Sequence, residues 1–177
     1  MSHHVLTGAP GAGKTALLQA LRDDYGYAVV PEAATDVIAA AHARGIPEPE
    51  RSAGLVADIA ALQRERRLVV AGDQRTVLFD RSAVCTLALA RYLGHPVPEV
   101  LTSELAEATY DHRVFVVRPL GFVVPTAARR IGYAESLAFE TVHVQVYGEL
   151  GYTLVDVPAT TVEERAALVD RLIRSWS

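Results

Sequence analysis

Apolar residues occur along the chain in five short, unbroken runs, separated by longer segments rich in alanine and leucine. A strand with one solvated face alternates apolar and polar residues, whereas a strand covered on both faces is apolar throughout. The five runs therefore predict five buried strands. They are HVLTG (4–8), YAVVP (27–31), TVLFD (76–80), RVFVV (113–117) and YTLVDV (152–157).

The segments between the runs predict seven helices. Strands that alternate with helices form parallel β-α-β units, which predict an α/β fold of three layers with a parallel sheet in the middle. In such sheets the ligand binds beyond the carboxyl ends of the strands. The expected helices span residues 14–24, 33–44, 52–70, 82–93, 98–109, 134–149 and 161–175.

Length and charge narrow the class of protein. The 177 residues suffice for one domain, expected over residues 1–177. A formal net charge of −4 argues against a nucleic-acid-binding protein, and no apolar run reaches the roughly 18 residues that span a bilayer. The N-terminal MSHHVLTG lacks the features of a secretory signal, and a single cysteine, Cys85, is typical of a reducing compartment. We therefore expect a cytoplasmic protein.

The glycine-rich loop after the first strand is the clearest candidate for chemistry. Its sequence, GAPGAGKT, matches the phosphate-loop (Walker A) pattern G-x-x-x-x-G-K-[ST]. Glycines let successive N–H groups point at an anion, and the following helix adds the positive end of its dipole. The alternative is a glycine-rich turn without a ligand. The expected phosphate-binding residues are Gly8, Ala9, Pro10, Gly11, Ala12, Gly13, Lys14 and Thr15.

Lys14 is the only lysine among 17 lysine and arginine residues. An ammonium group on a flexible stem follows a moving phosphate better than a planar guanidinium does. We expect Lys14 to reach the β- and γ-phosphates of a nucleotide, and the Thr15 hydroxyl to bind magnesium.

Carboxylates follow the second and third expected strands. The second leads into VVPEAATD, with Glu32 at the carboxyl edge and Asp36 one helical turn later. In a phosphoryl transferase, a carboxylate at this edge can accept the proton of the acceptor hydroxyl, and we expect this role for Glu32. The alternative is a favourable interaction with the first turn of the next helix, which we prefer for Asp36.

The third strand leads into VLFDRS. Asp80 can hold magnesium directly or through water. Arg81 can bind a phosphate or an acidic group bidentately, and its alternative is an ion pair with Asp80 or Glu32 that shapes the pocket. Ser82 can cap the next helix.

The fourth strand leads into a segment with three arginines. Arg118 ends the strand, and Arg129 and Arg130 precede the next helix. A lid over residues 118–134 would exclude water and bring an arginine to the transferred phosphoryl group. The alternative is solvated arginines at a helix start, and the sequence does not distinguish Arg129 from Arg130. The six histidines show no metal-ligand spacing.

These motifs resemble the small P-loop kinase-like ATPases often described as AAA domain proteins, relatives of the ribosylnicotinamide kinase domain and, more distantly, of deoxynucleoside kinases. The resemblance covers nearly the whole chain and rests on GAPGAGKT, VVPEAA, VLFDRS and VYGELGYTLVDVP. It implies a five-stranded sheet of order 2-3-1-4-5, an acidic residue at Glu32, the pair Asp80–Arg81, and a lid arginine at Arg129 or Arg130. Lids of this family often carry an acid beside the arginine, whereas here the first acid is Glu135.

The leading hypothesis is an ATP-dependent phosphotransferase that acts on a hydroxyl of a small metabolite or nucleoside-like acceptor. ATP and Mg²⁺ would bind the phosphate loop, and the acceptor would bind among residues 33–70 and 82–110. Thr15 and Asp80 are the expected metal ligands, and Arg129 is an expected nucleotide contact. The expected catalytic residues are Lys14, Glu32, Asp80, Arg81 and Arg130.

Other classes differ in the partners they require. The main alternative is a nucleotide-binding ATPase or regulatory protein without a dedicated acceptor. A guanine-selective GTPase is disfavoured because no second lysine remains for an Asn-Lys-x-Asp motif, and a kinase of nucleic-acid ends because basic, aromatic-interleaved stretches are missing. A homodimer is compatible with the sequence, which does not distinguish ATP from GTP.

Overall fold

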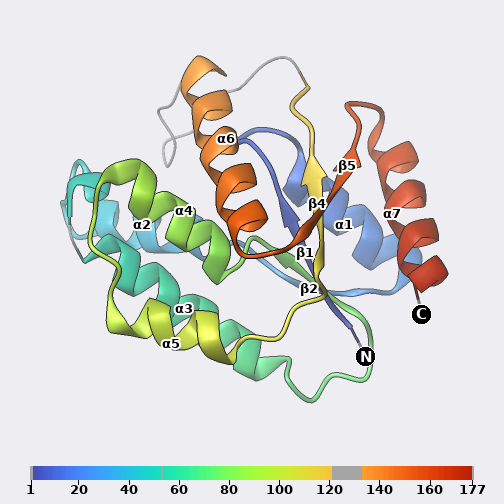
Figure 1. Cartoon of the computed structure of the whole chain (residues 1–177), viewed down its shortest axis with the longest axis horizontal. Coiled ribbons are helices and arrows are strands. Elements are labelled where there is room, and N and C mark those ends of the chain that lie inside the picture. The colour runs from blue at the N-terminus through green and yellow to red at the C-terminus, as the bar shows by residue number, and fades with distance from the viewer. Residues whose placement is uncertain (1, 53, 121–132, 177) are drawn as a thin grey trace.

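The computed structural model describes residues 2–52, 54–120 and 133–176 (Figure 1). Its centre is a sheet of five parallel strands in the order β2-β3-β1-β4-β5. The predicted α/β fold, the parallel pairing and the strand order are confirmed. The strands are β1 (His3–Thr7), β2 (Ala28–Val30), β3 (Val77–Asp80), β4 (Arg113–Val117) and β5 (Thr153–Val157).

Helices cover both faces of the sheet (Figure 1). Helices α1 (Lys14–Tyr25) and α7 (Val162–Trp176) pack together on one face, and the others gather on the opposite face. Among the residues that the structure describes, no helix is long and apolar enough to cross a membrane. The second group comprises α2 (Ala33–Ala43), the 3₁₀ helix η1 (Pro49–Arg51), α3 (Leu55–Val69), α4 (Ala83–Leu93), α5 (Glu99–Glu107) and α6 (Tyr133–Glu149).

Two hydrophobic cores explain the unbroken apolar runs. In β1, Val5 packs into the core beneath α4 and α6, and its neighbour Leu6 packs into the core beneath α1 and α7. Both side chains are fully buried, because each face of the strand meets a layer of helices. The run over residues 152–157 is partly exposed, since β5 is an edge strand.

Helix boundaries fall within a few residues of the predicted ones. Ser82 is the N-cap of α4, because its Oγ accepts a hydrogen bond of 3.2 Å from the Val84 N–H, as predicted. The expected helix 52–70 begins later, at Leu55. It is preceded by η1, whose first residue, Pro49, has the fixed φ that suits the start of a helical turn.

Candidate active site

The phosphate-loop sequence, residues 8–15, forms the turn from β1 into α1. Gly8, Gly11 and Gly13 have φ angles of 133°, 80° and 85°, a region that favours glycine. A Cβ atom on Gly8 would lie 2.3 Å from the Val117 carbonyl oxygen of β4, so a side chain has no room there. Lys14 is buried, and its Nζ donates to the carbonyl oxygens of Gly8 (3.2 Å) and Ala9 (3.0 Å).

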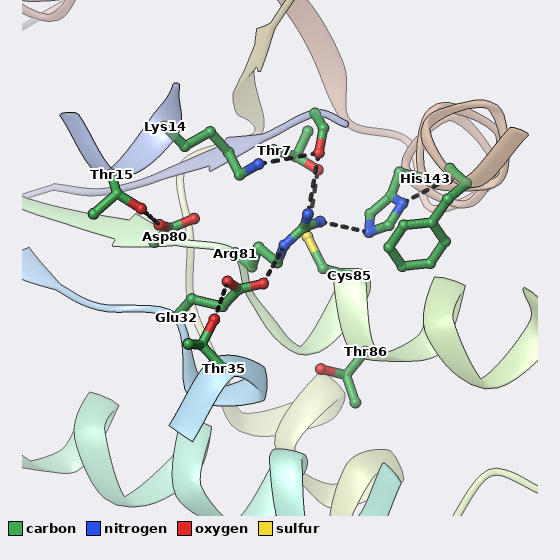
Figure 2. Close-up of polar contacts among 12 residues, drawn as sticks. Thr7, Lys14, Thr15, Glu32, Thr35, Asp80, Arg81, Cys85, Thr86 and His143 are labelled. Atoms are coloured by element: carbon green, nitrogen blue, oxygen red, sulfur yellow. Dashed lines mark hydrogen bonds and ion pairs between the residues drawn. The ribbon is translucent and has the colours of Figure 1, made fainter. Parts of the chain in front are cut away.

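Asp80, at the end of β3, faces the start of α1 (Figure 2). The Thr15 hydroxyl donates to Asp80 Oδ2 over 3.4 Å. Asp80 is 5% exposed, and its other oxygen, Oδ1, accepts no hydrogen bond from the residues described. A cavity of about 260 Å³ opens beside these two residues. A buried carboxylate oxygen without a donor is costly, so the position suits a cation.

Arg81 connects three parts of the site (Figure 2). It is the only non-glycine residue in the described ranges with a positive φ, 72°, and it is 7% exposed. Its Nε donates to Glu32 Oε1 (2.7 Å), and its Nη2 donates to the Gly8 carbonyl oxygen (3.2 Å). Its Nη1 lies 2.9 Å from His143 Nε2 of α6. The ion pair between Arg81 and Glu32, which was the alternative role for Arg81, is therefore present. A positive φ is costly for a residue with a side chain, and Arg81 adopts it at the end of β3.

His143 accepts the hydrogen bond from Arg81 as a neutral ring. Its Nδ1 lies 2.8 Å from the carbonyl oxygen of Phe139, and donation there leaves Nε2 as the acceptor. Burial, followed by the charge of Arg81, lowers the pKa of His143 to about 3. The ring is 1% exposed. His143 therefore restrains the guanidinium of Arg81 without adding charge to the site.

Glu32 lies where two cavities meet. Its Oε2 accepts a hydrogen bond of 2.8 Å from the Thr35 hydroxyl, while Oε1 is held by Arg81. The residue lines both the cavity beside Asp80 and a second cavity of about 280 Å³.

The second cavity is mostly apolar. Ile38 of α2, Ile59 of α3 and Leu89 of α4 are among its walls. They come from the segments 33–70 and 82–110 that were expected to bind the acceptor. One polar pair also lines the cavity, because the Thr86 hydroxyl donates to Gln63 Oε1 over 2.7 Å. The cavity thus combines a mostly apolar lining with a few polar groups, the usual form of a small-molecule site.

Two other acidic and basic residues that the sequence singled out form ion pairs. Asp36 lies in the first turn of α2, lines the cavity beside Asp80 and pairs with Arg66 of α3. Arg118 pairs with Glu140 (2.7 Å) and Asp156 (2.6 Å). Arg129 and Arg130, and most of the expected lid 118–134, lie outside the described residues.

Helix α6 contributes two residues that the sequence reasoning missed, His143 and Glu140. Glu140 is 7% exposed, and its Oε2 accepts a hydrogen bond of 3.0 Å from the Ala9 N–H of the phosphate loop. The two residues are three positions apart, so they share one face of the helix. Other polar residues also occur along α6, so this spacing is a weak sequence signal.

The chain has the features of a P-loop protein of the kinase and NTPase type. A phosphate loop joins the first strand of a parallel 2-3-1-4-5 sheet to the first helix, and an acid lies at the end of the neighbouring strand. The chain belongs to the AAA domain family, whose sequence model matches residues 3–165. No curated protein matches it in sequence.

Solved structures share this fold. Deoxyadenosine kinase from M. mycoides, with products dCMP and a flexible dCDP bound, matches with a TM-score of 0.66 at 14% identity, over 98% of this chain and 99% of that chain. NadR protein in complex with NR matches with a TM-score of 0.72 at 16% identity, over 98% of this chain and 50% of that chain. NadR with NAD and AMP-PNP matches with a TM-score of 0.72 at 17% identity, over 98% of this chain and 49% of that chain. The chain therefore spans about half the length of NadR, and at these identities the likeness is one of fold.

Proposed function

We propose that the protein is an ATP-dependent kinase that transfers the γ-phosphoryl group to a hydroxyl of a small metabolite or nucleoside-like acceptor. The observation that carries this proposal is the place of Glu32 between the cavity beside Thr15 and Asp80 and the larger apolar cavity. A base that takes the proton of an acceptor hydroxyl has to lie between nucleotide and acceptor. An ATPase without an acceptor has no use for the larger cavity.

Mg²⁺ and ATP would bind on the side of the phosphate loop. A hydroxyl and a carboxylate are the hard oxygen ligands that Mg²⁺ prefers, and Asp80 Oδ1 is buried without a donor among the described residues. Thr15 and Asp80 therefore fit the ion, which when bound would neutralise charge on the β- and γ-phosphates. AMP-PNP in one NadR structure supports ATP as the nucleotide.

Each residue of the site would have its own role in the transfer of the phosphoryl group. Glu32 accepts the hydroxyl proton as the acceptor oxygen attacks the γ-phosphorus and the bond to the leaving ADP oxygen breaks. Lys14 exchanges its loop carbonyls for phosphate oxygens, and Arg81 holds Glu32 and orients the acceptor or the phosphoryl group. A lid arginine, Arg129 or Arg130, would complete the charge stabilisation.

The test is ADP release from Mg-ATP, with and without a panel of hydroxylated metabolites and nucleosides, with mass spectrometry of the products. Strong stimulation by one compound that gains a phosphate group would establish the kinase. ADP release that no compound changes would favour the ATPase or regulatory protein.

Lys14→Ala is the control for this assay. Removing the ammonium group should abolish turnover, because the charge that follows the γ-phosphate is lost, while the circular dichroism spectrum stays that of a folded α/β protein. Turnover at the wild-type rate in Lys14→Ala would contradict the phosphate site itself.

A further inference from the structure

Arg165 of α7 lies behind the phosphate loop and is the largest fully buried side chain described, with 2% exposure. Its Nη1 donates to the Ala12 carbonyl oxygen (2.7 Å), its Nε to that of Pro158 (2.9 Å) and its Nη2 to that of Arg118 (3.0 Å). These carbonyls belong to the segments that leave β1, β5 and β4 at the carboxyl edge of the sheet. The guanidinium therefore joins three loops at the edge where nucleotides bind.

The charge of Arg165 has no carboxylate partner among the described residues, since its hydrogen bonds all end on backbone carbonyls. Burying a guanidinium without an anion is costly. The position adds to that cost, because Arg165 lies in the first turn of α7, where the helix dipole disfavours a cation. Burial also lowers the pKa of Arg165. An anion bound nearby would offset this cost.

The contact with Ala12 reaches the phosphate loop through one peptide unit. The Ala12 C=O and the Gly13 N–H belong to the same trans peptide, so they point in opposite directions. Arg165 Nη1 lies on the carbonyl side, and it is 3.4 Å from the place of a Cβ on Gly13. The Gly13 N–H donates to none of the described residues. A charged donor on the carbonyl polarises the peptide, which makes its N–H a stronger donor.

We propose that Arg165 is a positioning residue of the nucleotide site: it orients the Ala12–Gly13 peptide and supplies buried positive charge for the phosphate chain of a nucleoside triphosphate. This inference rests on the nucleotide-binding part of the proposed function and not on phosphoryl transfer.

The test compares the binding of Mg-ATP, Mg-ADP and inorganic tripolyphosphate, measured by calorimetry or by displacement of a fluorescent ATP analogue. Arg165→Met should lower the affinity for Mg-ATP about 10- to 100-fold, which is the loss expected for one charge-assisted hydrogen bond. The affinity for Mg-ADP, which carries less charge, should fall about 3- to 10-fold. The affinity for tripolyphosphate should fall as much as that for Mg-ATP. Arg171→Met removes the same charge from an exposed position of α7 and should leave all three affinities within about 2-fold.

A purely structural residue would give another pattern. Equal losses for Mg-ATP and Mg-ADP with unchanged tripolyphosphate binding, or a lower melting temperature with unchanged affinities, would overturn the inference. If Arg165→Met does not fold, Arg165→Lys takes its place. Lysine keeps the charge but not the three fixed contacts. Arg165→Lys should lower the affinity for Mg-ATP about 3- to 10-fold, and it should lower the affinity for Mg-ADP less. A protein that binds Mg-ATP but phosphorylates no acceptor would contradict the kinase and leave this test intact.

Discussion

At the scale of single residues, the site depends on how one carboxylate is held. Arg81 and Thr35 each donate to one oxygen of Glu32, and His143 restrains Arg81 in turn. A base fixed in this way keeps its position relative to the nucleotide, and positioning is the main contribution a protein makes to phosphoryl transfer.

Glu32→Gln should therefore slow transfer by about 10²- to 10⁴-fold while Mg-ATP binds nearly as before. The amide keeps the shape and one acceptor oxygen but cannot take the proton. Single-turnover kinetics with pre-bound Mg-ATP measure the chemical step, and titration of a fluorescent ATP analogue measures affinity.

Glu65→Gln is the matched control, because Glu65 is an exposed residue of α3 that lines neither cavity. Its transfer rate should stay within about 3-fold of wild type, since exposed substitutions away from a site change little. If Glu32→Gln instead loses Mg-ATP affinity and transfers normally from bound ATP, Glu32 is a metal or structural residue.

At the scale of elements, the turn between β1 and α1 depends on glycine at one point. Gly8→Ala should destabilise the protein by about 3 kcal/mol or more, because the new Cβ would meet the Val117 carbonyl oxygen at 2.3 Å with φ at 133°. Urea unfolding measures the loss, and nucleotide affinity should fall with it as the loop shifts.

Gly148→Ala serves as the comparison. Gly148 lies in α6 with no heavy atom within 4 Å of its Cβ position, so alanine should raise stability by about 0.5–1 kcal/mol. Equal effects of the two substitutions would mean that the close approach of the phosphate loop to β4 is absent in solution.

The helices and strands could be predicted from the sequence, but the face that each helix turns toward the site could not. Apolar runs such as VLF predict buried strands, and residues such as Glu32 and Asp80 follow because they lie at or just beyond the carboxyl end of a strand. The Glu32 partner of Arg81 was among the alternatives, but its other partner, His143, could not be found in this way because it lies on a helix. Polar and apolar residues are spread around α6, so no amphipathic stripe indicates the face that turns toward the phosphate loop. Arg165 was hidden for another reason: α7 has a clear apolar stripe, but only the packing of α7 on α1 brings this charged residue to Ala12.

At the scale of the whole molecule, two buried histidines couple stability to pH. His143 lies in the site, faced by Arg81, Lys14 and Glu140, and its pKa is lowered to about 3 by burial and then by Arg81. His4 of β1 lies near Asp111, Arg113 and His3, and burial lowers its pKa to about 4. Both side chains are 1% exposed and stay neutral in the folded protein at pH 5.

The sign of the pH effect follows from these two values. Below the unfolded pKa of 6.5, the unfolded chain takes up protons that the folded chain does not, so stability falls as the pH falls from 6.5 toward 4. The protons of His143 and His4 give a slope that approaches about 2.7 kcal/mol per pH unit. Burial also lowers the pKa of His3, which adds to the slope in the same direction. Arg113 lowers the pKa of Asp111 to about 2, and Arg75 does the same for Asp73. The stability that these two carboxylates contribute is therefore lost only below about pH 4.

Urea unfolding between pH 7.5 and 4.5 measures this slope. His143→Gln cannot take up the proton in either state, so its slope should be smaller by about 1.4 kcal/mol per pH unit, whatever the substitution does to stability at pH 7.5. His112→Gln is the exposed comparison, since the His112 side chain is 68% exposed, and it should change the slope less than His143→Gln does. A wild-type slope in His143→Gln would mean that His143 is protonated in the folded protein, and a protonated ring could not accept the hydrogen bond from Arg81.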